Sequence, residues 1–375
     1  MRIGFDALGA QVASVGAARY VHELERALLV LGMDVVPVGA RDGAGGGTPR
    51  RIARGIYREA IYYPWRFERL ARAAGCDLVH FAAALPGLAR RLPAVVTVND
   101  LLALQMPELF PRVVRLHTRH VLLPRAAKAA CVVTPSEHAR RELLEATPLS
   151  PERVFVTPYG RDERFVATEP DRDWLRTRFG VDGRIVLAVG TLEPRKNLVT
   201  ALRAFETVAA AGHDATLVVV GGQGWKNEAF EAALRATSAK VVLAGHVHDD
   251  ELVRLYGAAR CLVFPSLGEG FGFPPLEAMA CGTPVVAGDT TSVPEVVGDA
   301  GILIPPRDAE AFAGAIESLL VDDDLHGRLR ERSLARASAF TWSRCAAQTA
   351  EAYERALEGW SAGRSRTNMG ASTHA

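Results

Sequence analysis

Residues 264–282 read Phe-Pro-Ser-Leu-Gly-Glu-Gly-Phe-Gly-Phe-Pro-Pro-Leu-Glu-Ala-Met-Ala-Cys-Gly. The pattern predicts a buried strand that ends at Phe264, then a glycine-rich turn, then a helix from the proline pair to Gly282. Free backbone N–H groups and the dipole at a helix N-terminus favour phosphate or sugar oxygens. Glycines at 268, 270 and 272 allow a ligand to approach the backbone closely. The stretch therefore predicts a ligand site at the carboxyl end of a strand in an open parallel sheet.

Two acids stand in this stretch, Glu269 on the turn and Glu277 in the first predicted helical turn. Ionised carboxylates only accept hydrogen bonds, so they suit the hydroxyl groups of a sugar and a ribose. An ordinary structural role is the alternative for each acid. Glu277 near the third helical position would cap the helix, and Glu269 would be an exposed turn acid. The combination of both acids with the glycine-rich turn favours a site.

The rest of the chain alternates short apolar runs with helix-length segments. Apolar runs rich in Val, Ile and Leu predict strands buried on both faces of parallel sheets, and a helix is predicted over 19–32. The fold class is α/β with two Rossmann-like, doubly wound domains. The predicted strands are 3–5, 78–81, 95–98, 131–134, 154–156, 185–189, 216–220, 241–243, 261–264, 285–287 and 302–304.

The predicted domain boundary falls in a polar stretch after Tyr159, where Gly160 could act as a hinge. We expect an N-terminal acceptor-side domain over 1–163 and a C-terminal donor-side domain over 164–340. A helix over 341–360 is expected to return to the N-terminal domain. The small, polar residues 361–375 predict a disordered tail, and the glycine-rich run 39–49 predicts a mobile loop.

Bulk composition indicates a globular protein. The chain has 375 residues, 49% of them hydrophobic, and no run of 18 apolar residues. The N-terminus begins as a strand, so we expect a cytoplasmic protein, with peripheral contact to the inner membrane face as an option. Five scattered cysteines without a Cys-x-x-Cys pair predict buried free thiols. A net charge of +1 gives no reason to expect a nucleic acid partner.

The halves differ in charge, because residues 1–163 hold 22 Lys/Arg against 16 Asp/Glu and the remainder holds 22 against 27. Residues 50–75 contain seven arginines, two glutamates and interleaved aromatic side chains. Such a stretch could lie on anionic lipid or steer a lipid-linked acceptor. The favoured alternative is an amphipathic helix pair broken at Pro64, with its aromatics in the core and its arginines in water.

The two glutamates, with seven residues between them, resemble the Glu-x7-Glu signature of the retaining glycosyltransferases of family four, which have the GT-B fold. The resemblance covers nearly the whole chain. It implies two domains around a central cleft, a nucleoside diphosphate sugar as donor and an acceptor hydroxyl, with the anomeric configuration retained. It implies no metal and no cofactor.

The resemblance also implies roles for particular residues. Residues 188–197, Ala-Val-Gly-Thr-Leu-Glu-Pro-Arg-Lys-Asn, resemble the loop in which a basic pair holds the donor diphosphate, which gives that role to Lys196 and Arg195. Cations there would neutralise the charge of the departing group. Thr191 stands where many relatives place a further arginine. Glu269 would orient the sugar and Glu277 the ribose, while the backbone at Gly270, Phe271 and Gly272 would hold sugar hydroxyls.

Three further donor contacts follow from the resemblance. Val247 would present backbone atoms to the base, and Gly16 would border the phosphates. Asn99 stands where relatives usually carry a histidine that touches the donor sugar. An amide can donate and accept hydrogen bonds but cannot titrate, so no acid–base role carries over.

His246 and His248 lack a third metal ligand at suitable spacing, so no metal site is predicted.

The sequence leaves donor and acceptor open. The segment 191–197 occurs in relatives that use GDP-mannose and also in relatives that use other donors. It therefore favours GDP-mannose as the donor without identifying it. The acceptor could be a glycan, a lipid-linked molecule or a small molecule. The alternatives are a sugar-nucleotide epimerase or phosphorylase on the same fold, and a donor-binding module without catalysis.

Overall fold

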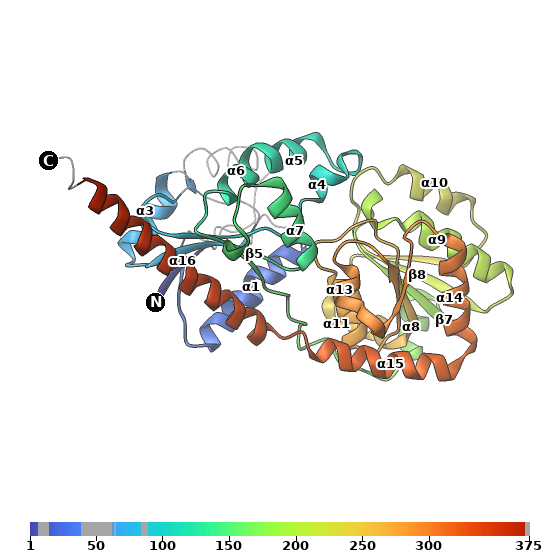
Figure 1. Ribbon diagram of the computed structural model, residues 1–375. Helices are drawn as coiled ribbons and strands as arrows, with labels where there is room; N and C mark the ends of the chain where they lie inside the picture. The colour runs from blue at the N-terminus through green and yellow to red at the C-terminus, as the bar shows by residue number, and fades with distance from the viewer. Residues whose placement is uncertain (7–14, 39–61, 64, 84–88, 372–375) are drawn as a thin grey trace. The chain divides into compact units, whose positions relative to one another are not determined.

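The computed structural model describes residues 1–6, 15–38, 62–63, 65–83 and 89–371, apart from the side chains of residues 15 and 363–371. The chain forms two compact units (Figure 1). Unit 1 comprises Met1–Gly160 with Trp342–Ala375, and unit 2 comprises Arg161–Thr341. The sequence placed the boundary at residue 163, close to this division. The predicted loop 39–49 and half of the basic stretch 50–75, residues 50–61 and 64, lie outside the described residues.

Unit 1 contains a parallel six-stranded sheet in the order β2-β1-β3-β4-β5-β6. The strand Asp34–Val38, β2, was not predicted, because Pro37 interrupts its apolar run. A proline removes one ladder hydrogen bond and is tolerated at a sheet edge, which is the place of β2. The strands are β1 Arg2–Asp6, β2 Asp34–Val38, β3 Leu78–Phe81, β4 Ala94–Thr97, β5 Cys131–Thr134 and β6 Val154–Val156.

Helices cover the unit 1 sheet, and α16 packs against α1 and β5 (Figure 1). α16 continues to Ala371, whereas the sequence predicted a helix end near Gly359 and disorder over 361–375. A single glycine costs a helix about 1 kcal/mol relative to alanine and does not by itself end it. The helices are α1 Val15–Val30, α3 Phe67–Ala73, α4 Leu102–Gln105, η3 Pro107–Leu109, α5 Arg112–His117, η4 Thr118–Leu122, α6 Leu123–Ala126, α7 Glu137–Ala146, η5 Pro151–Arg153 and α16 Trp342–Ala371.

A buried group of neutral side chains attaches α16 to this sheet. The His80 ring nitrogens lie 2.6 Å from the Tyr353 hydroxyl on α16 and 2.9 Å from Thr97 Oγ1 on β4. The Tyr20 hydroxyl lies 3.0 Å from the same Thr97 oxygen. Burial lowers the pKa of His80 to about 3, so the imidazole is neutral near pH 7. We call these four residues the His80 network.

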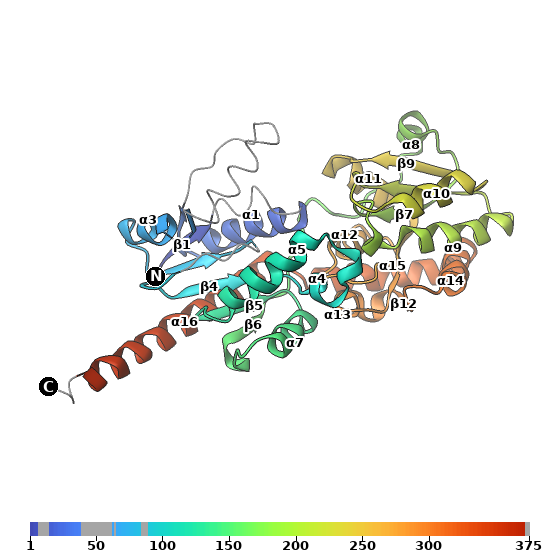
Figure 2. The ribbon, with the colours of Figure 1, turned by 90° about the horizontal axis from the view of Figure 1, so that it is seen from above.

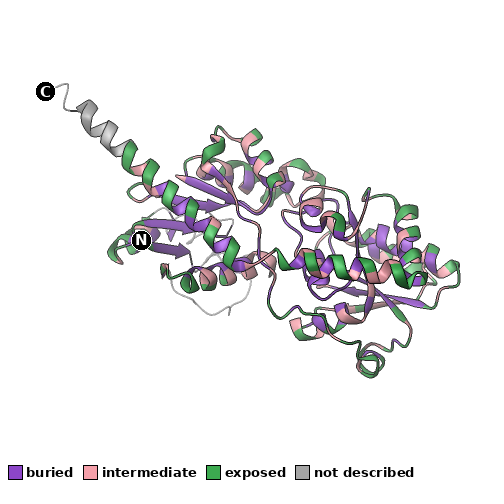
Figure 3. Ribbon diagram, turned by 60° about the horizontal axis from the view of Figure 1, so that its bottom comes forward, coloured by how far each residue is buried: buried purple, intermediate pink, exposed green. Residues whose placement is uncertain are grey.

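Unit 2 also contains a parallel six-stranded sheet, in the order β12-β11-β10-β7-β8-β9. Its central strands are long apolar runs, as expected for a sheet covered on both faces, and Figure 3 shows strands as largely buried and the outward helix faces as exposed. The strands are β7 Arg184–Val189, β8 Ala215–Val220, β9 Val241–Gly245, β10 Ala259–Phe264, β11 Val285–Gly288 and β12 Ile302–Ile304.

On one face of this sheet α9 and α14 pack side by side (Figure 2), around a core that contains Phe205 and Phe312. The helices of unit 2 are α8 Arg172–Phe179, η6 Pro194–Lys196, α9 Leu198–Ala210, α10 Glu228–Ala236, α11 Asp249–Ala258, α12 Phe273–Ala280, α13 Val293–Val297, η7 Gly298–Ala300, α14 Ala309–Val321 and α15 Asp323–Ser338.

The α/β prediction with two parallel sheets is confirmed. The five cysteines are free and buried, as predicted. Part of the basic stretch 50–75 is described, and there Tyr62, Tyr63 and Phe67 are buried whereas Trp65 is 72% exposed. Three of these four aromatics therefore fit the amphipathic alternative. Within the described residues, no helix is both long and apolar enough to cross a membrane.

Candidate functional site

The loops that follow β7, β8 and β9 pack closely at the carboxyl edge of the unit 2 sheet. Gly190 N–H donates to Val220 O at 2.8 Å, and Gly221 N–H donates to Gly245 O at 2.8 Å. A Cβ added at Gly221 would lie 1.9 Å from the Gly190 carbonyl oxygen. Only glycine permits this approach. The close packing fixes the start of the loop that carries Arg195 and Lys196.

The carboxylate of Glu269 is the centre of the site. Its Oε1 lies 2.7 Å from Lys196 Nζ and its Oε2 lies 2.6 Å from Arg195 Nη1. The Ser266 hydroxyl donates to Oε1 at 2.6 Å. Glu269 is 8% exposed, so it is not the exposed turn acid of the alternative interpretation. Arg195 and Lys196 lie within η6 and converge on one carboxylate, which is 73 residues from Lys196 in sequence.

Sequence reasoning missed Glu193. Its Oε1 lies 2.6 Å from Arg195 Nη2, and its side chain is only 4% exposed. The signal was present in the segment Leu-Glu-Pro-Arg-Lys, where an acid precedes the basic pair by two residues. We call Glu193, Arg195, Lys196, Ser266 and Glu269 the Glu269 cluster.

The charges in this cluster perturb one another. Burial would raise the pKa of Glu269, but the nearby Arg195 and Lys196 cations and the Ser266 hydroxyl outweigh it and lower that pKa to about 2. Glu269 is therefore ionised near pH 7. Burial lowers the pKa of Lys196, and Glu269 opposes that effect. Lys196 Nζ also lies 5.0 Å from the Phe264 ring centre, within cation–π range.

Hydrogen bonds hold the backbone of the glycine-rich turn. Ser292 Oγ donates to Glu269 O at 2.7 Å and to Phe271 O at 2.8 Å, and Glu269 N–H donates to Thr291 Oγ1 at 2.9 Å. Among the described residues, positive φ angles outside glycine occur at Asn197, Lys226 and Thr291. All three follow strands at the same sheet edge. Strained backbone of this kind gathers at functional sites.

Glu277 lies further along its helix than predicted. α12 begins at Phe273 after the N-cap Gly272, so Glu277 is the fifth helical residue and lies beyond the third position, where a capping glutamate stands. The capping alternative is wrong because the helix begins before the proline pair. Glu277 is 5% exposed, and the Tyr256 hydroxyl donates to its Oε2 at 3.1 Å. Glu277 is therefore an oriented, buried acceptor.

The remaining unit 2 candidates differ in exposure. Phe271 is buried, Gly270 is half-buried, and Gly272 has φ +121°, which favours glycine at the helix start. Thr191 is exposed on the loop after β7. Val247 is 4% exposed, and its backbone contact with a base stays a prediction.

Two family models match the chain. Residues 176–336 match the model described as Glycosyl transferases group 1, and residues 15–165 match Glycosyltransferase Family 4. The O-antigen chain mannosyltransferase B of Escherichia coli is 33% identical over 267 residues, which cover 70% of each chain. The chain belongs to glycosyltransferase family 4. The serotype-specific mannosyltransferase WbdA of Escherichia coli is 28% identical over 240 residues, 62% of this glycosyltransferase and 29% of WbdA, so the chain spans less than a third of that relative.

Solved structures confirm the GT-B fold of this glycosyltransferase. The sucrose-phosphate synthase of Thermosynechococcus elongatus has a TM-score of 0.73 at 22% identity, and the alignment covers 95% of this chain and 98% of that one. HepE of Anabaena, crystallised with UDP-glucose, has a TM-score of 0.71 at 20% identity, with 94% and 98% covered. At these identities the likeness concerns the fold alone.

Gly16 and Asn99 of the glycosyltransferase belong to unit 1. Gly16 is the second residue of α1, and residues 7–14, which come before this helix, lie outside the described residues. Asn99 follows β4 and accepts a hydrogen bond from the Tyr159 hydroxyl at 2.5 Å. Tyr159 is stacked on Tyr20 and Trp342. The amide is therefore held in place, which the sequence did not indicate.

In the described part of the glycosyltransferase, no group of three His, Cys, Asp or Glu side chains is arranged to hold a metal ion. His248 precedes α11, and its N–H donates to Glu251 Oε2 at 3.4 Å. This contact gives His248 a structural place at the helix start.

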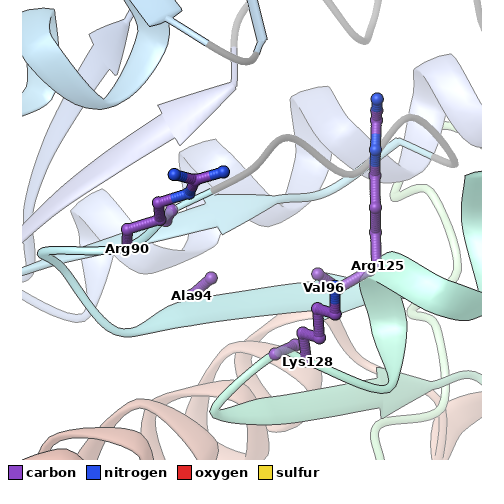
Figure 4. Close-up of a pocket in the computed structure, with 7 residues that line it drawn as sticks. Arg90, Ala94, Val96, Arg125 and Lys128 are labelled. Atoms are coloured by element: carbon purple, nitrogen blue, oxygen red, sulfur yellow. The ribbon is translucent and has the colours of Figure 1, made fainter.

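A cavity of about 150 Å³ lies in unit 1 (Figure 4), lined by Arg90, Arg125 and Lys128 and by apolar residues including Ala94 and Val96. Ala94 begins β4, so the cavity reaches the amino end of that strand. Ligands of open parallel sheets bind at the carboxyl ends. The cavity is therefore distinct from the predicted donor contacts of the glycosyltransferase.

Proposed function

We propose that this glycosyltransferase transfers a glycosyl unit from a nucleoside diphosphate sugar to an acceptor hydroxyl and retains the anomeric configuration. The observation that carries the proposal is the convergence of Lys196 and Arg195 on the carboxylate of Glu269. Two partly buried cations at a sheet edge suit a diphosphate, and an adjacent ionised carboxylate suits sugar hydroxyls.

Each group has a chemical task in this proposal. Lys196 and Arg195 bind the diphosphate and stabilise the negative charge that grows as the sugar leaves, so neither a metal nor a cofactor is required. Glu269 orients the sugar, and Glu277 accepts a hydrogen bond from the ribose. The backbone at Gly270–Gly272, together with Thr191, Val247, Gly16 and Asn99, completes the donor contacts.

Retention follows from a front-face substitution. The bond between the anomeric carbon and the phosphate oxygen breaks, and the acceptor oxygen bonds to the same face of that carbon. The acceptor proton passes to the departing phosphate oxygen. The Glu269 cluster contains no cysteine or histidine. Its Ser266 hydroxyl is fully buried and donates to Glu269, whose pKa of about 2 makes it too weak a base to activate a nucleophile.

The relatives favour a particular donor and acceptor. Two are named mannosyltransferases, one of them for O-antigen chains, which supports mannose as the transferred sugar and a glycan as the acceptor. GDP-mannose as the donor and a lipid-linked acceptor are part of the proposal. HepE was crystallised with UDP-glucose, which supports a nucleoside diphosphate sugar as the class of donor and makes a UDP-sugar a second candidate. The proposed location is cytoplasmic, with peripheral contact to an anionic membrane.

A thermal-shift screen across GDP-, UDP-, ADP- and dTDP-sugars tests the donor, because a ligand that binds only the native state stabilises it. We expect one base to give the largest shift, and Glu277→Gln to reduce it. Incubation with candidate acceptors should then release free nucleoside diphosphate and a glycosylated product of retained configuration, detected by NMR. Binding without transfer would indicate a donor-binding module, and an isomerised donor would indicate an epimerase.

A further inference from the structure

We propose that Glu193 is a positioning residue that sets the charge balance of the Glu269 cluster and so limits how tightly the site holds a diphosphate, an inference that rests on the proposed function. Glu193 is 6% exposed, and its side chain faces Arg195 rather than solvent. Glu193 is a buried carboxylate beside Arg195, the residue proposed to bind the diphosphate. Its presence calls for an explanation, because a carboxylate competes with phosphate for the same cation.

The geometry places the Arg195 guanidinium between two carboxylates. Its Nη2 lies 2.6 Å from Glu193 Oε1, and its Nη1 lies 2.6 Å from Glu269 Oε2 and donates to Gly268 O at 2.8 Å. The side chain of Arg195 is 17% exposed. Glu193 therefore holds one terminal nitrogen of the guanidinium, while the glycine-rich turn holds the other.

The formal charges of the cluster cancel. Arg195 and Lys196 contribute two positive charges, and Glu193 and Glu269 contribute two negative charges. A diphosphate brings further negative charge to this group, in surroundings where charges interact more strongly than in water. Without the carboxylate of Glu193 the cluster would carry one net positive charge and would attract a diphosphate more strongly.

Weaker diphosphate binding has a use in catalysis. The nucleoside diphosphate product keeps the diphosphate, so each interaction that holds the donor also holds the product. Product release limits turnover in many enzymes. Interactions equally strong for donor, transition state and product do not raise the rate of the chemical step. Glu193 thus keeps Arg195 oriented while reducing binding that would slow release.

A purely structural role for Glu193 gives the opposite expectation. The Glu193 backbone joins η6 to the loop, since its N–H donates to Thr191 O at 2.8 Å and its carbonyl accepts from Lys196 N–H at 3.1 Å. These contacts survive a side-chain substitution. If the side chain only held Arg195 in place, its loss would displace the guanidinium and weaken diphosphate binding. The two roles therefore predict changes of opposite sign.

The test is calorimetric titration of Glu193→Gln with inorganic pyrophosphate, GDP and UDP. We expect affinity to rise about five- to tenfold for the diphosphates that bind the wild type, the scale of one added charge in a partly buried site. Product inhibition should strengthen by a similar factor while kcat falls. Glu193→Asp keeps the charge and should bind within about twofold of wild type. Glu331→Gln makes the same change on the exposed face of α15 and should alter nothing.

Unchanged or weaker binding in Glu193→Gln would overturn the inference. The proposed function would still stand if Lys196→Ala abolished diphosphate binding in the same experiment. If none of the three probes bound the wild type, the diphosphate site itself would be rejected, and the inference with it. A Glu193→Gln chain that stayed unfolded even with saturating pyrophosphate would show a folding role and overturn the charge-balance role.

Discussion

The Glu269 cluster and the His80 network are both buried polar groups, one in each unit, but they differ in kind. The His80 network consists of neutral groups, and both ring nitrogens of His80 have partners inside the protein. The Glu269 cluster contains two basic and two acidic side chains and one hydroxyl, at a sheet edge with strained neighbouring backbone. A neutral, satisfied network attaches a helix to a sheet, whereas convergent charges at strand ends are suited to bind a charged ligand.

The largest expected difference between the Glu269 cluster and the His80 network is in their effect on enzyme activity. Lys196→Ala should lower kcat by about 10²- to 10³-fold, because it removes a cation that stabilises the departing diphosphate. Lys240→Ala is the matched control, since Lys240 is 71% exposed and pairs with an exposed aspartate of the same unit. Initial rates of nucleoside diphosphate release measure both. A Lys196→Ala rate within threefold of wild type, roughly the effect of a surface change, would remove the functional distinction.

The packing of the loops after β7 and β8 should be disrupted by an alanine at Gly221 but not by an alanine at Gly222. Gly221→Ala places a Cβ 1.9 Å from the Gly190 carbonyl oxygen, whereas a Cβ at Gly222 meets nothing within 4 Å. We expect Gly221→Ala to reduce the free energy of unfolding of unit 2 by about 3 kcal/mol and to weaken donor binding. Gly222→Ala should stay within about 1 kcal/mol. Urea unfolding compares them, and equal losses would contradict the packing account.

The His80 network should respond in stability rather than in activity. Tyr353→Phe removes the hydroxyl that contacts His80 Nδ1 and leaves a buried ring nitrogen unsatisfied. The expected loss is about 1–3 kcal/mol in the unfolding of unit 1. Arg355→Ala, at an exposed site on the same helix, should change stability by about 0.5 kcal/mol or less. If kcat of Tyr353→Phe fell by more than the loss of folded protein explains, the His80 network would have a role in activity, which would contradict the comparison.

The smallest expected effect is in the pH dependence of stability. The pKa of His80 is about 3 when folded, against 6.5 ordinarily, so below pH 6.5 the unfolded chain binds a proton that the folded chain does not. Unit 1 should lose about 1 kcal/mol of unfolding free energy between pH 7 and pH 5.5. The pKa of Glu269 is lowered from 4.5 to about 2, so its contribution is present above pH 4.5 and is lost towards pH 2.

Hydrogen exchange resolved by unit separates these two windows. Protection in unit 1 should fall as the pH is lowered from 7 to 5.5, after correction for the intrinsic exchange rate. Over that range the Glu269 contribution to unit 2 should stay constant. A flat unit 1 profile would show that His80 accepts a proton in the folded state.

Local sequence patterns predicted most of the strands because buried parallel strands are uninterrupted apolar runs, as at β5 and β8. They missed β2, where Pro37 is tolerated only because the strand is at an edge. The helix start before Glu277 was misplaced because prolines mark the first helical turn without fixing its first residue.

The resemblance named the main charges of the site, but the sequence could not show that Lys196 and Arg195 share one carboxylate 73 residues away. Glu193 was missed because its place two residues before the basic pair indicates an ion pair with Arg195 but does not show that the pair is buried. The contact between Tyr159 and Asn99, 60 residues apart, likewise depends on the folded sheet.

The central claim is that the Glu269 cluster binds the donor diphosphate. Its most direct test is calorimetric titration of wild type, Lys196→Ala and Lys240→Ala with the nucleoside diphosphate sugar that gives the largest thermal shift. We predict saturable binding to wild type and Lys240→Ala, and binding at least about tenfold weaker to Lys196→Ala. Equal affinity in all three proteins would contradict the claim.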